Sequence, residues 1–299
     1  MKKILLLLSL AVAMTMTSCL GDSDEPNTIL TANYTCYNKI VDTEASERTY
    51  NLVAGTYVFS MDLVNLKLDL AIRGTFGESG EVNLTLRDLT LHIQQSSGEY
   101  TFSADMLTPE VAEGIAGSHT ISNLRGTIHP YVLTNGTSMT QVLVYQISFF
   151  IDTRYEVMAI DKDSYIFSQN TVTTPANGGS SYSTSLTQYE VDFVDTQKAD
   201  VLIYNAKFVD NMPQISFKLQ NIPVTLTETG YTLHIDEIIP VLSTSDTPAT
   251  QYPISDFNLR MSGSEMNLRF NCTPTVSGLS GTYTVSSNGS VYPPQQNSY

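Results

Sequence analysis

An alternating pattern of apolar residues that slips by one position occurs twice in this sequence. The first copy slips at Arg87-Asp88 and the second at Gln220-Asn221. Strict alternation predicts a half-buried β-strand, and a slip turns the side chains that follow it to the other face. Each copy therefore predicts a strand interrupted by a bulge or tight bend, where Asp88 and Asn221 suit an Asx-type turn. The apolar positions of the two copies differ by 133 residues throughout: Val82, Leu84, Leu86, Leu89, Leu91 and Ile93, then Ile215, Phe217, Leu219, Ile222, Val224 and Leu226.

The similarity between the two halves continues beyond these strands. The segment 98–105 matches 229–236, and Ile121-Ser122-Asn123-Leu124 matches Ile254-Ser255-Asp256-Phe257. A repeat of this length predicts two units of about 130 residues, the first at 32–160 and the second at 161–286. One domain, in which the two halves pair their sheets into a single body, is the alternative. The tail 287–299 has little apolar content, and we expect it to be unstructured.

The fold class predicted for both units is all-β, with antiparallel strands in either a barrel or a sandwich. Residues 64–72 and 143–151 alternate with a period of two. The best helical signal is 109–115, where Thr108 could cap one or two turns that start with Pro109. The polar segment 171–183, which contains Pro175, predicts a mobile loop or part of the connection between the units.

The N-terminus has the pattern of an export signal. Lys2 and Lys3 precede an apolar run over 4–12, and the small residues Thr17 and Ser18 stop directly before Cys19. The run is too short to span a bilayer, so 1–18 is predicted to be a cleaved signal peptide. The arrangement resembles bacterial lipoproteins. The resemblance implies that Cys19 receives diacylglycerol and anchors the mature chain to a membrane through its acyl chains, which would include palmitate.

The residues after Cys19 are acidic and polar, and 19–31 is predicted to be a flexible tether. Ser23, Asp24 and Glu25 resemble the surface-export signal of Bacteroidetes lipoproteins. That resemblance implies a position on the extracellular side of the outer membrane. The alternative is an acidic linker that carries no export signal. Segments 98–107, 121–124 and 231–257 also resemble, loosely, the calycin-like β-barrel modules of secreted Bacteroidetes proteins. This second resemblance implies a fold and a location but no activity.

Charge and composition exclude one class of partner. The chain has 30 acidic and 15 basic residues, a net charge of −15, and its lysines and arginines are scattered, so we expect no nucleic acid partner. The 17 tyrosines could contact a small ligand, a glycan or a protein, although the absence of tryptophan disfavours a glycan. The sequence thus predicts a binding protein, with a structural, adhesion or assembly subunit as the alternative.

Few residues suggest chemistry. Cys36 and Cys272 could form a disulfide outside the cytoplasm, but Cys272 continues an alternating apolar run and is better explained as a buried thiol. Asp161 and Asp163 could contact Ca²⁺, but they lack the other oxygen ligands of a calcium loop, so a solvated turn is the better explanation. Four histidines, His92, His119, His129 and His234, are too scattered to predict a metal site. No motif of a hydrolase or of a cofactor is present, so we expect neither enzyme activity nor a cofactor.

Overall fold

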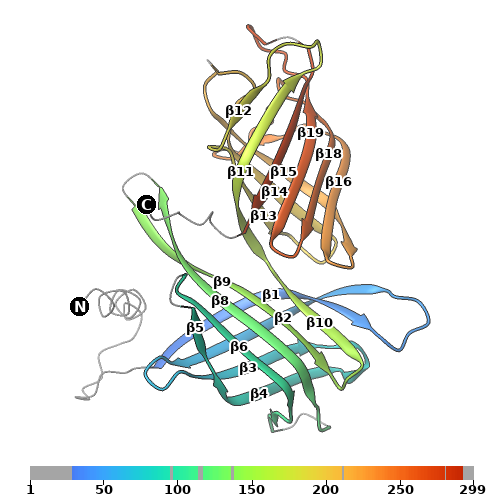
Figure 1. The fold of residues 1–299 in the computed structure, drawn as a ribbon. Helices are drawn as coiled ribbons and strands as arrows, with labels where there is room; N and C mark the ends of the chain where they lie inside the picture. The colour runs from blue at the N-terminus through green and yellow to red at the C-terminus, as the bar shows by residue number, and fades with distance from the viewer. Residues whose placement is uncertain are drawn as a thin grey trace, which may run out of the picture. The chain divides into compact units, whose positions relative to one another are not determined.

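A computed structural model describes residues 29–94, 97–113, 117–135, 138–210, 212–279 and 281–291. Its regular structure is almost entirely β-strand (Figure 1). The chain divides into two compact units, the first ending at Ile160 and the second beginning at Asp161. Within the described ranges no helix is long and apolar enough to cross a membrane. The predicted signal peptide, Cys19 and the segment Ser23-Asp24-Glu25 lie outside the described residues.

Each unit contributes ten strands to one sheet. The strands of the first unit are β1 (Ile29–Asp42), β2 (Tyr50–Asp62), β3 (Lys67–Thr75), β4 (Glu81–Thr90), β5 (His92–Gln94), β6 (Glu99–Leu107), β7 (Glu110–Val111), β8 (Ile121–Asn135), β9 (Ser138–Ile151) and β10 (Tyr155–Asp161), with a short 3₁₀ turn, η2 (Gly77–Ser79). The strands of the second unit are β11 (Asp163–Pro175), β12 (Tyr182–Thr184), β13 (Gln188–Phe193), β14 (Lys198–Ala206), β15 (Ile215–Thr227), β16 (Gly230–Ile238), β17 (Val241–Leu242), β18 (Ile254–Ser262), β19 (Glu265–Cys272) and β20 (Tyr283–Ser290).

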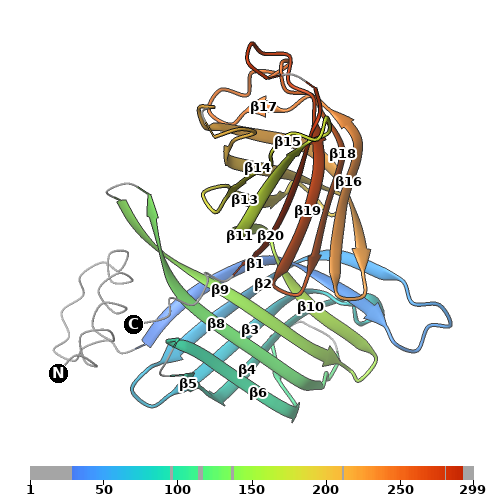
Figure 2. The same cartoon turned by 45° about the horizontal axis from the view of Figure 1, so that its top comes forward.

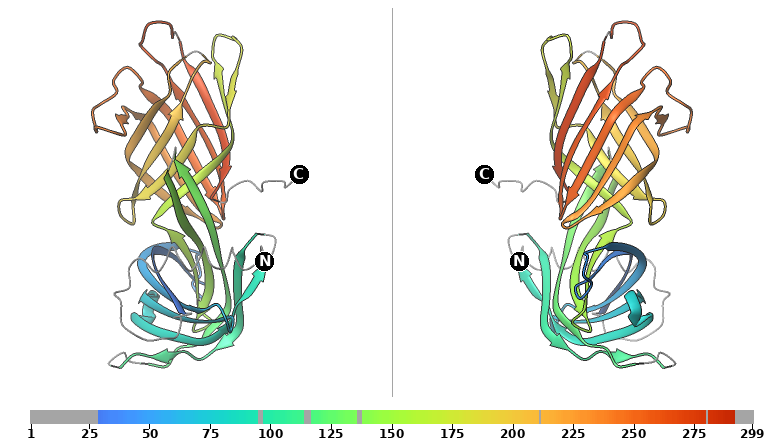
Figure 3. Two further views of the ribbon diagram at one scale, coloured as in Figure 1. Left: turned by 90° about the vertical axis from the view of Figure 1, so that its left-hand side faces the viewer. Right: turned by 90° about the vertical axis from the view of Figure 1, so that its right-hand side faces the viewer.

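The second sheet closes on itself. Its strand order is β12-β11-β13-β14-β15-β16-β18-β19-β20, and β11 also pairs with β20. Eight of these strands therefore form a closed ring, which is seen from two sides in Figure 3. Closure satisfies the backbone hydrogen-bonding groups that an open sheet would leave bare at its edges. Of the two architectures that the alternation allows, the structure of this unit is the barrel.

The first sheet curls until β4 comes close to β6, but the pairings among its described strands do not close it into a ring (Figure 2). Its order is β5-β6-β8-β9-β10-β1-β2-β3-β4-β7, so β4 and β5 lie near opposite ends of the sheet. These two strands are nevertheless consecutive in the chain and are separated only by Leu91. In the second unit a single long strand, β15, takes the place of both β4 and β5. It pairs with β14 through its first part and with β16 through its last residues. The predicted all-β fold with two related antiparallel units is thus confirmed.

The predicted slip is a β-bulge in both units. Asp88 and Asn221 have positive φ angles of 55° and 57°, a conformation that Asp and Asn tolerate better than most residues. The strand register shifts beside each of them. Each bulged backbone N–H donates to an aspartate of the neighbouring strand, at 2.9 Å to Asp69 and at 2.8 Å to Asp200. The bulge and the side chain that accepts its N–H are therefore both duplicated.

A second bulge also occurs at equivalent positions in the two units. The repeat in the sequence aligns these positions, but the repeat alone does not predict an irregularity there. Asn123 and Asp256 each have a φ of 50°, and the register of β8 with β9 and of β18 with β19 shifts beside them. Because the two residues are 133 positions apart, the repeat extends to backbone geometry as well as to apolar pattern.

Aromatic rings fill the interior of the first unit. The ring of Tyr145 stacks between those of Tyr34 and Phe59, with centroid distances of 4.6 and 4.8 Å, and Phe102 meets Phe59 edge-on at 6.3 Å. All four side chains are buried. Offset and edge-on packing of this kind adds to the stabilisation from burial alone.

Four sequence expectations about local structure were wrong. Instead of a helix at 109–115, Glu110–Val111 forms β7, which pairs with β4, and Glu110 accepts a hydrogen bond from Arg87. Much of the predicted loop 171–183 is strand, because β11 continues to Pro175 between β20 and β12. Ser287 to Ser290, assigned to the tail, complete β20 and close the ring. Residues 29–31, assigned to the tether, begin β1 and pair with the end of β2.

Candidate functional site

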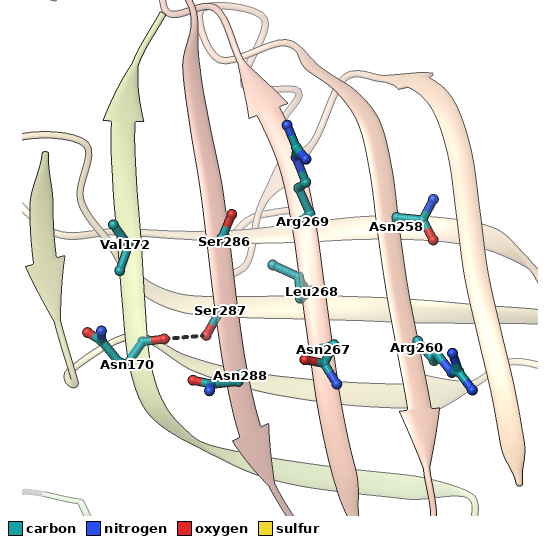
Figure 4. Close-up of a pocket in the computed structure, with 10 residues that line it drawn as sticks. All are labelled: Asn170, Val172, Asn258, Arg260, Asn267, Leu268, Arg269, Ser286, Ser287 and Asn288. Atoms are coloured by element: carbon teal, nitrogen blue, oxygen red, sulfur yellow. Dashed lines mark hydrogen bonds between the residues drawn. The ribbon is translucent and has the colours of Figure 1, made fainter. Parts of the chain in front are cut away.

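A groove with a volume of about 500 Å³ lies on the outer face of the second barrel (Figure 4). It crosses four adjacent strands, β18, β19, β20 and β11. Most of the side chains that line it point outward from the barrel, as the exposure of alternate residues along these strands requires. The lining residues are Asn170, Val172, Asn258, Arg260, Asn267, Leu268, Arg269, Ser286, Ser287 and Asn288.

Strand register arranges the outward side chains in two rows. The first row is Arg260, Asn267, Asn288 and Asn170, and the second is Asn258, Arg269, Ser286 and Val172. Neighbours in a row are directly paired across strands, so they are about 5 Å apart, and the two rows are separated by about 7 Å along the strands. The groove floor is therefore a nearly regular lattice of amide, guanidinium and hydroxyl groups.

A buried hydroxyl cluster lies beneath one end of this lattice. The Ser287 hydroxyl is 3.1 Å from that of Ser168 and 2.9 Å from that of Thr171, and Thr171 is 3.1 Å from the Tyr189 hydroxyl. Ser287 also donates to the backbone carbonyl of Asn170 at 3.3 Å, as Figure 4 shows. The register of β11 against β20 shifts at this point, which is typical of a bulge that re-aims a side chain. The cluster holds the bulge in place and positions the exposed Asn170.

The electrostatic character of the groove differs from that of the chain as a whole. No carboxylate is among its ten lining residues, although acidic residues outnumber basic ones twofold in the sequence. Within the described part of the chain, the guanidinium groups of Arg260 and Arg269 form no ion pair, whereas Arg87, Arg125 and Arg154 all pair with carboxylates. The two groove arginines are thus free to bind an anionic group from solution.

The chemistry available in the groove is hydrogen bonding. Guanidinium groups only donate, asparagine amides both donate and accept, and serine does either. None of the ten lining residues is a carboxylate, a cysteine or a histidine that could act as a general base or a nucleophile. The arrangement can therefore bind a polar ligand through hydrogen bonds.

Comparison with known proteins gives little beyond this geometry. No protein-family model matches the chain, and no curated protein matches it. A crystal structure of a candidate outer membrane protein from Bacteroides fragilis is similar over 87% of this chain and 97% of that one, with 12% sequence identity and a TM-score of 0.35. A TM-score this low does not establish a shared function, so the site is judged on its own residues.

Both described cysteines are free and buried, each inside its own unit. Cys36 lies on β1, and Cys272 ends β19. The disulfide considered from the sequence is therefore absent from the structure, because each thiol is enclosed by the core of a different unit. Burial raises the pKa of the Cys272 thiol to about 12, which keeps it protonated and unreactive at neutral pH.

The histidines lie apart, as their spacing suggests. His92 is exposed on β5, and the ring of His129 lies 3.3 Å from Glu99. His119 is buried, and its Nδ1 atom is 2.9 Å from an Asp152 carboxylate oxygen. His234 hydrogen-bonds Asp236 at 3.2 Å and reaches the edge of the groove, where it contacts Asn258 at 3.2 Å. Within the described ranges no three His, Cys, Asp or Glu residues are placed to hold a metal ion.

Asp163, considered above as a calcium contact, instead belongs to a row of aspartates. Asp163 pairs across strands with Asp192, and Asp192 pairs with Asp200. Burial, a hydrogen bond that the protonated Asp192 donates to Asp163, and repulsion from the neighbouring carboxylates raise the pKa of Asp192 to about 6. In the unfolded chain the pKa of this group returns to about 3.9. The folded state therefore binds more protons than the unfolded state between pH 4 and pH 6, and its stability falls as pH rises through this window.

We expect the substitution Asp192→Asn to stabilise the second barrel at pH 7.5 by about 1 kcal/mol after allowance for solvent screening, and to have no such effect below pH 4. Denaturant unfolding monitored at both pH values measures the difference. Asp210→Asn, at an exposed position of the same unit, serves as the matched control and should change stability at neither pH. A gain from Asp192→Asn that is equal at both pH values would contradict the raised pKa.

Proposed function

We propose that this protein is a lipid-anchored, non-catalytic binding protein of the outer membrane, and that the groove on the second barrel takes its ligand. The observation that carries the proposal is the pair of unpaired guanidinium groups set among outward-facing amides. Exposed charged side chains are common on any protein surface, but these two lie in a hollow from which carboxylates are missing. A chain with this net charge gains solubility from its acidic residues, so their absence from the lining of this groove favours recognition there.

The N-terminal sequence supports the anchor and the location. Lys2, Lys3 and the apolar run that ends before Cys19 form the export signal of a lipoprotein, and the acidic segment that follows is long enough to hold a folded body away from the lipid. Ser23, Asp24 and Glu25 support the extracellular side. A ligand would then reach the groove from outside the cell.

Closure of the second barrel weighs against the alternative of an assembly subunit that accepts a partner strand. Such subunits use an exposed strand edge, whose free N–H and C=O groups pair with the incoming strand. The ring from β11 to β20 is closed, so its strands are paired on both sides. Recognition on this face must therefore use side chains.

Filling the groove should abolish binding. Ser286 is exposed at the centre of the second row, and the substitution Ser286→Trp would place a large ring over the neighbouring amides without disturbing an outward strand position. We expect a panel of neutral oligosaccharides, acidic oligosaccharides and short peptides to include at least one compound that shifts the NMR resonances of groove residues. The same compound should leave the resonances of the Ser286→Trp protein unchanged.

The control for this experiment is Ser103→Trp, the same substitution at an exposed strand serine of the first unit. It should bind as the unmodified protein does. Shifts that map to another part of the protein, or that survive Ser286→Trp, would show that the groove is not the binding site. The absence of shifts for every compound of the panel would likewise count against the proposal.

A further inference from the structure

We infer that the ligand of this groove is an acidic oligosaccharide, a short chain of sugars in which carboxylates meet Arg260 and Arg269 while hydroxyls meet the asparagines. The inference rests on the proposed function, because it names the class of ligand for the same groove. Three properties of the groove carry it: the placement of its positive charge, the form of its other polar groups, and the pairing of its strands.

Positive charge in the groove is divided between two separated points. Arg260 and Arg269 lie on neighbouring strands, and the register pairs Arg260 with Asn267 and Arg269 with Asn258. The two arginines are therefore diagonal neighbours, with backbones about 7–8 Å apart. Their side chains extend in different directions from this diagonal (Figure 4). A single small anion would not need two diverging guanidinium groups, whereas a ligand with carboxylates on separate units would use both, each through a bidentate pair.

Between and beside the arginines lie groups that match hydroxyls. Asn258, Asn267, Asn288 and Asn170 each present an amide N–H₂ and a C=O in one plane, and Ser286 adds a hydroxyl. Each amide can donate to one oxygen and accept from its neighbour, which suits the adjacent hydroxyls of a sugar ring. The rows span four strands, or about 14 Å, enough for a short oligosaccharide and wide for a single small molecule.

An acidic peptide fits these strands less well. Peptides in extended form bind sheets through backbone hydrogen bonds at a free edge and through pockets for alternate side chains. β18, β19 and β20 are each paired on both sides, and β11 is paired with β20 and β12 beside the groove. Val172 is the one outward apolar side chain in the two rows. The groove therefore offers neither an edge nor apolar pockets, and its polar lattice favours a ligand made of hydroxyls.

The charge of the whole chain limits how acidic the ligand can be. A net charge of −15 repels dense polyanions at long range, and only the two groove arginines offset this locally. We expect sugars with widely spaced carboxylates, bound with an affinity that falls as salt concentration rises.

The test compares two sugars that differ only at their carboxyl groups, which are ionised in one and methyl esters in the other. The full-length chain in detergent is titrated in a calorimeter with tetragalacturonate and with its fully methyl-esterified form. We expect the acid to bind at least about tenfold more tightly than the ester, because hydrogen bonds to a charged group contribute more than neutral ones. Arg260→Gln and Arg269→Gln should each weaken binding of the acid by about tenfold and leave binding of the ester unchanged. Arg73→Gln, at an exposed arginine of the first unit, is the matched control and should change neither.

Each other outcome overturns the inference in a recognisable way. Equal binding of acid and ester, lost in Ser286→Trp, would leave the groove as a sugar site and remove the role of charge. Binding of tetraglutamate as tight as that of tetragalacturonate would exclude the saccharide as the preferred class. If neither sugar binds but another compound of the panel still occupies the groove, the inference is refuted and the proposed function stands. If no compound of the panel occupies the groove, the proposed function is refuted together with the inference.

Discussion

Replacing Cys19 by alanine is expected to move this protein from the membrane fraction to the soluble fraction. Each buried methylene of an acyl chain contributes about 0.8 kcal/mol to membrane binding, and more than one chain is needed for stable attachment. The acyl chains on Cys19 are the anchor that the proposal requires. The measurement is sedimentation of membranes from cells grown with a labelled fatty acid, followed by detection of the label and of the protein.

Cys36→Ala is the matched control for this experiment, because it removes a thiol that is buried in the first unit. This variant should keep both the label and the membrane association. If the Cys19→Ala protein stayed in the membrane fraction, the lipoprotein interpretation would be wrong. Protease added to intact cells, with a periplasmic marker as the integrity control, should digest the unmodified protein if it faces outward. Protection would place it inside the envelope and remove the export role of Ser23, Asp24 and Glu25.

The second large effect is expected at Asp200, which holds the bulge of the second barrel. Its side chain is 8% exposed, accepts the Asn221 N–H at 2.8 Å and pairs with Lys218 at 2.9 Å. Asp200→Ala leaves a partly buried N–H and a partly buried ammonium group without their partner, and we expect it to reduce the free energy of unfolding by about 2 kcal/mol. Hydrogen exchange of the β14 and β15 amides measures the loss within this unit.

The repeat supplies a matched comparison for Asp200. Asp69 occupies the equivalent position in the first unit, where it accepts the Asp88 N–H and pairs with Arg87, but its side chain is 35% exposed. Water can replace the lost contacts there, so Asp69→Ala should destabilise the β3 and β4 amides much less than Asp200→Ala destabilises those of β14 and β15. Equal losses in the two units would show that burial does not decide the size of the effect.

Some features of the fold are visible in the sequence because they depend on neighbouring residues. The alternation at 82–93 and 215–226 predicts strands, and its slip predicts the bulges that the structure has at Asp88 and Asn221. Other local signals were misleading. Pro109 and Glu110 suit the start of a helix, but pairing with β4 and the contact between Glu110 and Arg87 favour a strand. Tertiary contacts override weak propensities of this kind.

The groove residues carry almost no signal of their own. Asn258 and Arg260, Asn267 and Arg269, and Ser286 and Asn288 each occupy alternate positions of a strand, as solvated polar residues of any half-buried strand do. The pairing of Asn170 with Asn288 joins positions that are far apart in the chain. Nothing at either residue specifies the other, because pairing depends on which strands become neighbours when the sheet closes.

The sequence by itself therefore determined the all-β class, the duplication and the bulge within each copy, since each depends on residues close together in the chain or on a fixed repeat offset. The tertiary structure alone decided that the second sheet closes as a barrel, that both described cysteines stay free, and that two arginines and four asparagines share one outer face. Those outcomes depend on strand register between distant segments, and register is set by the packing of the whole barrel rather than by any local pattern.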